Sequence, residues 1–192
     1  MGVMARVFFS VPGIREIGSY LTQMDRPMSF EELSGKFAES DDFDLVIFPE
    51  GSNCFFGPSH ELQEFRSPRF VELSIETGTP ILLSVHRGSE SWAKTLPVPS
   101  EFVDKLAGLP ESLLNFVEKR LRKTGLFTIP LLPLPMDLFS LECELYWPET
   151  TRAQLCGDLE ARKDAVRAEA ARIRVRMNAI LNRLKQETLL DN

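Results

Sequence analysis

The sequence contains few histidines and cysteines, and it lacks any long apolar run. Its two histidines, His60 and His86, are too few and too isolated to provide a metal site, so we expect no metal. The three cysteines form neither a CxxC pair nor an even disulfide set, which favours a reducing, cytoplasmic compartment. No segment reaches the ~18 consecutive apolar residues that a membrane-spanning helix needs, so we expect no transmembrane helix.

Charge is distributed unevenly along the chain, whose net charge is −6. Residues 1–151 carry 13 Lys and Arg against 22 Asp and Glu, a net charge of −9, whereas residues 152–187 carry 9 against 5, a net charge of +4. The acidic body argues against nucleic acid as a partner. The basic C-terminal segment is compatible with an anionic membrane surface.

The apolar pattern predicts alternating strands and helices in one domain, 1–192. Ser29 is placed to cap a helix with acidic residues in its first turn. A buried strand over 43–48, a helix over 68–77 and a strand over 79–85 follow in the order of a parallel strand–helix–strand crossover.

The sequence of the second half of the chain predicts two further strands and two helices. We expect a helix over 100–124, strands over 126–134 and 141–147, and a long terminal helix over 152–187. Apolar residues of the terminal helix alternate spacings of four and three, which places them on one stripe. They are Val166, Ala170, Ile173, Met177, Ile180 and Leu184.

The most informative segment is the hexapeptide Phe48-Pro49-Glu50-Gly51-Ser52-Asn53 at the end of an apolar run. Pro49 restricts the residue before it to extended geometry, and Gly51 permits a positive φ. Glu50 is therefore held on a stiff turn at a strand end, where open α/β sheets bind ligands. The alternative is a carboxylate that only accepts local N–H groups within the turn.

The sequences DLVIFPEGSN and EFRSPRFVELSIETGTPILLSV resemble the glycerolipid and lysophospholipid acyltransferases (PlsC-like), whose third motif is FPEG. The resemblance implies an α/β fold like that of glycerol-3-phosphate acyltransferase, with a mixed, largely parallel sheet covered by helices and a long C-terminal helix. It also implies acyl transfer from acyl-CoA or acyl carrier protein to the hydroxyl of a lysophospholipid or other glycerolipid. No bound cofactor is needed, and the enzyme would be peripheral to a membrane.

The resemblance also suggests which residues bind the acceptor. Glu50 would contact it, Gly51 would keep the turn open, and Ser52 keeps the hydroxyl of the family's usual threonine. Asn53 stands where the family commonly has arginine. The loss of this cation weakens the expectation that the acceptor carries a phosphate.

Three arginines are further candidates for binding the acceptor. Arg26 lies in an Asp-Arg pair that resembles the family's second motif, although the pair could also be an ordinary surface pair. Arg66 and Arg69 stand where the family has a basic residue before the helix that follows the turn. Either could replace the missing arginine, or both could be solvated residues at a helix entry.

The family's catalytic His-x-x-x-x-Asp pair is not found in the sequence. His60 and His86 are the only candidates for the base, and the residues five positions later are Phe65 and Ser91. We expect either a chain that is N-terminally incomplete relative to the family or a catalytically inactive lipid-binding protein. A third hypothesis is a membrane-peripheral module that uses the basic cluster over 119–123 and the terminal helix.

Overall fold

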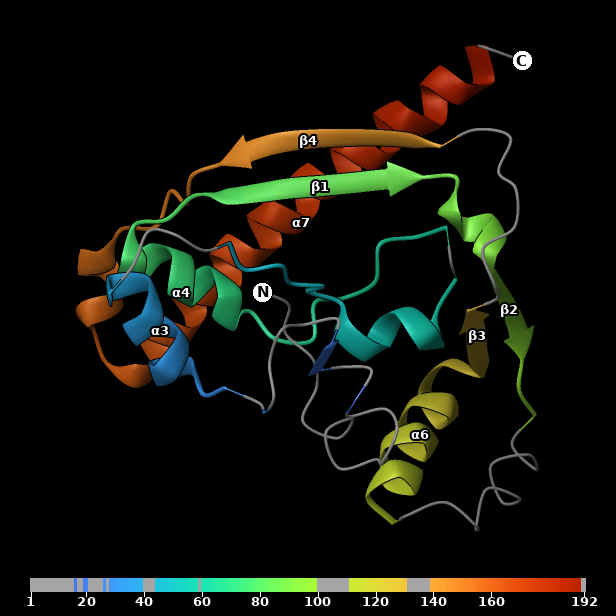
Figure 1. Ribbon diagram of the computed structural model, residues 1–192, viewed down its shortest axis with the longest axis horizontal. Helices are drawn as coiled ribbons and strands as arrows, with labels where there is room; N and C mark the ends of the chain where they lie inside the picture. Colours follow the sequence, from blue (N-terminus) through green and yellow to red (C-terminus); the bar gives the residue numbers. More distant parts are fainter. Residues whose placement is uncertain are drawn as a thin grey trace. The chain divides into compact units, whose positions relative to one another are not determined.

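The computed structural model describes residues 16, 19, 20, 26, 28–39, 44–58, 60–99, 111–130 and 139–190. They belong to two compact units whose segments alternate along the chain (Figure 1). The first unit takes its residues from 1–49, 67–85 and 141–192, and the second takes its residues from 50–66 and 86–140.

The described part of the first unit includes the helices α3, α4 and α7 and a two-stranded sheet of β1 and β4. Figure 1 shows the β1 and β4 arrows pointing in opposite directions, so the sheet is antiparallel. Its elements are α3 (Phe30–Glu39), α4 (Arg69–Thr77), β1 (Ile81–Arg87), β4 (Ser140–Tyr146), the 3-10 helix η3 (Arg152–Cys156) and α7 (Leu159–Leu190).

The ends of α3 and α4 follow from local sequence. The Ser29 hydroxyl accepts the Glu32 N–H at 3.2 Å, and the Glu32 carboxylate accepts the Ser29 N–H at 2.7 Å, which completes a capping box and confirms the predicted start of α3. Pro68 immediately precedes α4, and Gly78 ends it with a φ of 67°. This left-handed conformation suits glycine because it has no Cβ.

The long terminal helix is divided in two at Gly157. Asp158 starts α7, because its carboxylate accepts the N–H groups of Glu160 and Ala161 at 3.0 and 2.8 Å. The predicted apolar stripe of α7 is confirmed: Ile173 and Ile180 are completely buried, and Val166, Ala170 and Leu184 are nearly so. The sequence therefore predicts the buried face correctly but not the break before the helix.

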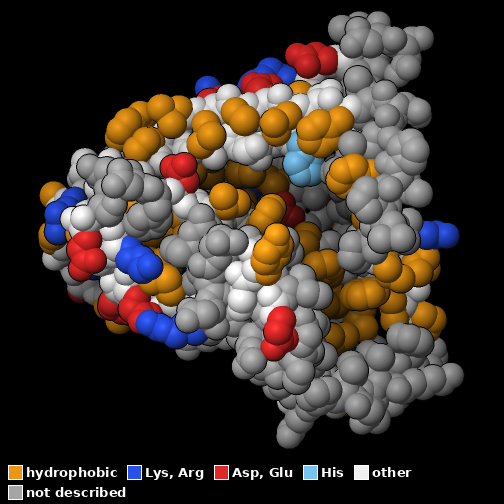
Figure 2. Space-filling model, in the orientation of Figure 1, with side chains coloured by type: hydrophobic (Ala, Val, Ile, Leu, Met, Phe, Trp, Pro, Cys, Tyr) orange, Lys and Arg blue, Asp and Glu red, His pale blue; other side chains and the backbone are white. Residues whose placement is uncertain are grey.

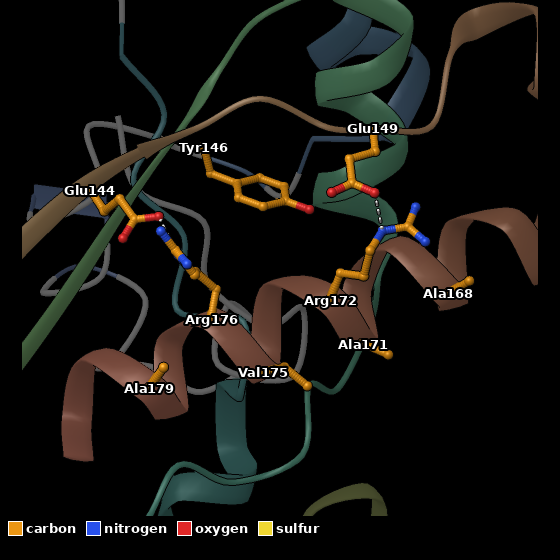
Figure 3. A pocket seen from close by; sticks show the side chains of 9 residues that line it. All are labelled: Glu144, Tyr146, Glu149, Ala168, Ala171, Arg172, Val175, Arg176 and Ala179. Carbon is orange, nitrogen blue, oxygen red and sulfur yellow. Dashed lines mark hydrogen bonds and ion pairs between the residues drawn. The ribbon is translucent and has the colours of Figure 1, made fainter. Parts of the chain in front are cut away.

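The contact between β4 and α7 is charged. Arg176 Nε donates to Glu144 at 2.6 Å, and Arg183 donates to Glu142 (Figure 3 shows the first pair). Alternate residues of a strand point to opposite sides of a sheet. The acidic side of β4 therefore faces the helix, and its other side faces away from it.

Glu169 is the centre of this contact. It has no exposed surface, and its carboxylate accepts hydrogen bonds from the Tyr146 hydroxyl and from Arg172. It also accepts the N–H groups of Glu149 and Thr150, at 3.2 and 2.9 Å, and the Thr150 hydroxyl at 2.6 Å. Burial alone raises the pKa of Glu169, but the bonds from Arg172, Thr150 and Tyr146 outweigh it and lower the pKa to about 2.

The second unit is built on the antiparallel pair of β2 and β3, with Ala93 opposite Pro130 and Pro97 opposite Leu126. Phe56 and Leu121 form its buried core. Its elements are the 3-10 helices η1 (Gly51–Phe56) and η2 (Ser89–Trp92), the strands β2 (Ala93–Pro97) and β3 (Leu126–Pro130), and the helix α6 (Glu111–Thr124).

The mixed α/β class and the long C-terminal helix are confirmed. Within the described residues, the two sheets are two-stranded and antiparallel, and the largely parallel sheet stays a prediction.

The buried strand predicted over 43–48 is wrong for the described residues 44–48, because only Val46 forms a bridge and the side chains of Val46 and Phe48 are 54% and 76% exposed. Pro49, which lacks an N–H, prevents the ladder from continuing. Residues 100–110 and 131–138 of the predicted elements lie outside the described residues.

No helix in the described parts of the chain is both long enough and apolar enough to cross a bilayer.

Replacing Glu169 with glutamine should lower the free energy of unfolding at pH 7 by about 2–3 kcal/mol, because it removes a buried charge that accepts hydrogen bonds from the half-exposed Arg172 and from Thr150 and Tyr146. The low pKa in the folded state means that this stabilisation is complete above pH 4.5 and is lost as pH falls towards 2. Urea denaturation of both proteins should therefore show a difference that shrinks across this pH range.

Glu160→Gln is the matched control on the same helix. Glu160 is an exposed residue that pairs with Lys163, so its loss should change the free energy of unfolding much less than the loss of Glu169. Equal destabilisation by the two substitutions would contradict the central position of Glu169.

Candidate functional site

The FPEG turn is the candidate site. The Asn53 N–H donates to the Glu50 carbonyl at 3.0 Å and closes the turn. Gly51 has a φ of 53°, in the left-handed region, as the sequence predicts. Glu50 itself has helical angles, with φ −65° and ψ −29°, and it immediately precedes η1.

Arg66 is the predicted cation that the structure brings to this turn. A Cβ added to Gly51 would lie 3.3 Å from Arg66 Cδ, so the absence of a side chain at Gly51 allows the arginine to pack against the backbone. Asn53 Nδ2 donates to the Glu64 carbonyl at 2.8 Å. Asn53 therefore fixes the segment that carries Arg66, although it cannot supply a charge itself.

Arg120 of α6 is a second cation in the same unit. Its guanidinium carbon lies 5.9 Å from the centre of the Phe56 ring, at the end of η1. Burial and the positive charge of Arg66 both lower the pKa of Arg120. Arg66 thus packs at the start of η1 and Arg120 at its end.

Cys54 also belongs to the turn. Its thiol donates to the Gly51 carbonyl, with a distance of 2.9 Å from Sγ to the oxygen. Desolvation and the Glu50 carboxylate raise the pKa of Cys54 to about 11. The thiol therefore stays protonated at neutral pH and is a poor nucleophile.

Arg26 and Arg69 belong to the first unit and are not grouped with the turn. The Arg26 guanidinium donates to Glu32 at 2.6 Å, and this bond, together with the Ser29 N–H, lowers the pKa of Glu32 to about 2. Arg69 lies over the Phe30 ring at 5.6 Å. Of the two arginines that flank Ser67 and Pro68, Arg66 belongs to the unit that contains Glu50 and Gly51, and Arg69 belongs to the first unit. The described residues give no position for the Ser52 side chain.

The two histidines lie in the second unit. His60 Nε2 is 3.7 Å from a carboxylate oxygen of Glu61, and its side chain is 63% exposed. The His86 ring lies 5.7 Å from the ring of Phe139. The carboxylate beside His60 is thus its neighbour in the sequence, whereas the family motif places an aspartate five positions later.

A shallow groove of about 570 Å³ lies between β4 and α7 in the first unit (Figure 3). Two of its acidic side chains are paired, Glu144 with Arg176 and Glu149 with Arg172, at 2.6 and 3.4 Å. Burial and the neighbouring Glu169 raise the pKa of Tyr146, which also lines the groove, to about 12. At neutral pH its two carboxylates are ion-paired and the Tyr146 hydroxyl stays protonated. The groove is therefore a weaker candidate for a catalytic site than the FPEG turn.

The sequence predicts Arg120 as part of a basic cluster over 119–123 and does not predict its position in the unit that contains the turn. Arg120 follows Val117 by three positions and precedes the buried Leu121, so it lies at the border of the apolar face of α6. That position was visible in the sequence. Its neighbour Phe56 was not, because the contact joins residues far apart in the chain.

No group of His, Cys, Asp and Glu side chains in the described parts of the chain could hold a metal ion. Comparisons of the chain with family models, with curated proteins and with solved structures found no match.

Gly51→Ala should lower the free energy of unfolding by about 1–2 kcal/mol, because the left-handed conformation is unfavourable for alanine and its Cβ would crowd Arg66. Gly35→Ala in α3 is the matched control. A Cβ at Gly35 meets nothing within 4 Å, so this substitution should stabilise the helix by about 0.5–1 kcal/mol. Urea denaturation should give shifts of opposite sign, and stabilisation by both substitutions would contradict the turn geometry.

Glu50→Gln should accelerate alkylation of Cys54 by iodoacetamide, because removal of the negative charge lowers the pKa of the thiol. The thiolate fraction rises tenfold for each unit by which the pKa falls, so we expect an increase of about threefold near pH 8.5. Peptide mass spectrometry follows the rate, with Cys156 in the other unit as the internal control. Unchanged alkylation of Cys54 would show that Glu50 does not face the thiol.

Proposed function

We propose that the chain is an acyltransferase of phospholipid or glycerolipid synthesis or remodelling, and that it binds the acceptor at the FPEG turn. The proposed reaction moves a fatty acyl group from acyl-CoA or acyl carrier protein to a hydroxyl of a lysophospholipid or other glycerolipid. The observation that carries the proposal is the packing of Arg66 against Gly51. The Arg66 side chain packs against the residue that follows Glu50, on a turn whose sequence resembles the acyltransferase motif, and this supports the proposal.

The turn supplies two complementary groups for such an acceptor. The Glu50 carboxylate can accept a hydrogen bond from an acceptor hydroxyl. Arg66 and Arg120 can bind an anionic headgroup, and their guanidinium groups can donate two parallel hydrogen bonds to a phosphate. Arg66 therefore takes the place of the charge that is absent at Asn53, and a phosphate-bearing acceptor becomes the favoured substrate.

The chemistry requires attack of the acceptor oxygen on the thioester carbonyl. A carbon–oxygen bond forms, the carbon–sulfur bond breaks, and the thiol of the donor leaves. A general base must take the hydroxyl proton. The candidates in this chain are His60 and His86, and the proposal includes the larger, largely parallel sheet that the family resemblance implies.

The alternative is an acyltransferase-like protein that binds lipid, or a membrane surface, without turnover. It is favoured by the environment of the histidines, since His60 contacts only its sequence neighbour Glu61 among the carboxylates at ion-pair distance in the described residues. A catalytic imidazole normally has a carboxylate that fixes its tautomer. In this alternative the acceptor site is the same, but no acyl group is transferred.

Binding of a short-chain lysophosphatidic acid, measured by isothermal titration calorimetry, tests the acceptor site. Arg66→Gln should weaken binding about tenfold or more, because hydrogen bonds to a charged group contribute about 1.5–3 kcal/mol. Arg122→Gln is the matched control on α6: Arg122 is half exposed, pairs with Glu118 at 2.8 Å and should not affect binding. The corresponding monoacylglycerol, which lacks the phosphate, should bind equally to all three proteins.

Equal binding of the phosphorylated lipid by the Arg66→Gln and Arg122→Gln proteins would contradict the acceptor site. Turnover is a separate measurement, with acyl-CoA and the same lipid. We expect little or no transfer by this chain, and measurable transfer that is lost in His60→Gln or His86→Gln would identify the base. Binding without transfer supports the inactive alternative.

A further inference from the structure

The polarity of β4 is the reverse of what a surface strand normally shows. Glu142 and Glu144 point towards α7, where they pair with arginines. The residues between and beside them point away from the helix, and they are Leu141, Cys143 and Leu145. An antiparallel sheet with one covered face usually covers its apolar side. Here the covered side of β4 is charged, whereas the covered side of β1 carries the buried Leu83 and Val85.

The outward face of the β1–β4 sheet is apolar and exposed. Leu82, Leu141, Leu145 and Trp147 are each between 54% and 62% exposed. Figure 2 shows a row of hydrophobic side chains along this sheet. The described outward positions are Leu82, Ser84 and His86 on β1 and Leu141, Cys143, Leu145 and Trp147 on and beyond β4, and they include no Lys, Arg, Asp or Glu. His86, a candidate base, therefore lies at one end of this face.

The centre of this face is formed by small side chains. Cys143 Sγ lies 3.7 Å from Ser84 Oγ on the neighbouring strand, and both side chains are exposed. They are the middle residues of β4 and β1. The large side chains lie towards the strand ends, so the face has a low centre between raised apolar ends.

We propose that this outward face, from Leu82 and Ser84 on β1 to Leu141, Cys143, Leu145 and Trp147 on β4, binds the same face of a second copy of the chain. Two such faces would meet about a twofold axis near Cys143, as two sheets stacked ~10 Å apart. This inference is independent of the proposed acyltransferase activity.

The charge of the chain restricts where two copies can meet. Each copy carries a net charge of −6, so two copies repel each other over most of their surface. The outward face has no charged side chain at its described positions, and two copies can meet there without opposing like charges.

The exposed area is also sufficient. Six side chains that are each more than a third exposed present on the order of 600 Å² per copy, so a dimer would bury about 1,200 Å², at the lower end of the range for specific interfaces. The interface should therefore be reversible, with a dissociation constant on the order of 1–100 µM.

Sedimentation velocity across this concentration range tests the dimer. The unmodified chain should shift from monomer to dimer, and Leu145→Glu should raise the dissociation constant about 100-fold or more, because a twofold interface would bury two carboxylates. Leu159→Glu is the matched control, since Leu159 is 65% exposed at the start of α7 and lies outside the sheet. Circular dichroism should show that both variants are folded.

Cross-linking gives an independent readout of the geometry. A protein that keeps only Cys143, with Cys54→Ser and Cys156→Ser, should give a covalent dimer with a short bismaleimide. A protein that keeps only Cys156, which is also exposed, should not. Cross-linking through Cys143 should disappear when Leu145→Glu is added.

Three outcomes would overturn the proposal. They are a monomer at all concentrations, association that Leu145→Glu and Leu159→Glu reduce equally, and cross-linking through Cys156 as efficient as through Cys143. Binding of the unmodified monomer to phosphatidylcholine vesicles, abolished by Leu145→Glu and without dimer formation in solution, would also overturn it in favour of a lipid surface.

Discussion

The buried carboxylate of Glu169 constrains the first unit more than any other group. A carboxylate without exposed surface is stable only when charged or polar donors surround it, and here a strand end, a turn and the next turn of its own helix provide them. Moving α7 along or around its axis would separate the carboxylate from donors on β4 and on the following turn. Glu169 therefore fixes the register between the helix and the strand.

This register determines which side of β4 is available to a partner. Because Tyr146 points to Glu169, the residues two and four positions earlier, Glu144 and Glu142, must point the same way. They meet Arg176 and Arg183, which lie seven residues, or about two turns, apart on the helix. The apolar residues between them are then directed outwards. The exposed face and the buried ion-pair network are thus two consequences of one geometric constraint.

The same network explains the uneven charge along the sequence. Six of the nine Lys and Arg residues between 152 and 187 have carboxylate partners in the described structure, four of them outside the immediate neighbourhood in sequence. Arg162, for example, pairs with Glu72 and Glu76 of α4. The positive helix and the acidic body are complementary parts of one molecule, so the charge asymmetry does not by itself require an anionic membrane.

Local features of the fold were predictable because their causes lie within a few residues. The capping box at Ser29, the left-handed Gly78 and the apolar stripe of α7 all follow from short-range geometry. The alternation of β4 also revealed two distinct faces, but it could not reveal which face meets the helix. The usual assumption, that the apolar face is covered, fails here because Glu169 sets the register.

The candidate site shows the same division between local and long-range causes. The turn at Gly51 was predictable, whereas the choice between Arg66 and Arg69 depends on Asn53, whose amide holds Glu64 and so keeps the segment before Ser67 at the turn. After Pro68 the chain enters α4, and Arg69 belongs to another unit. Arg120 reaches the turn only through the packing of α6 beside η1, which no local pattern encodes.

The chemistry of this turn also limits how an acyl group could be transferred. Cys54 is the nucleophile closest in sequence to Glu50 whose contacts are described, and a pKa of about 11 leaves a thiolate fraction on the order of 10⁻⁴ at neutral pH. An acyl-enzyme intermediate on this thiol would form slowly. The carboxylate that suits Glu50 to an acceptor hydroxyl is also a cause of the raised pKa of Cys54. For the acyl transfer that we propose, the turn therefore favours direct attack by the acceptor over covalent transfer through the protein.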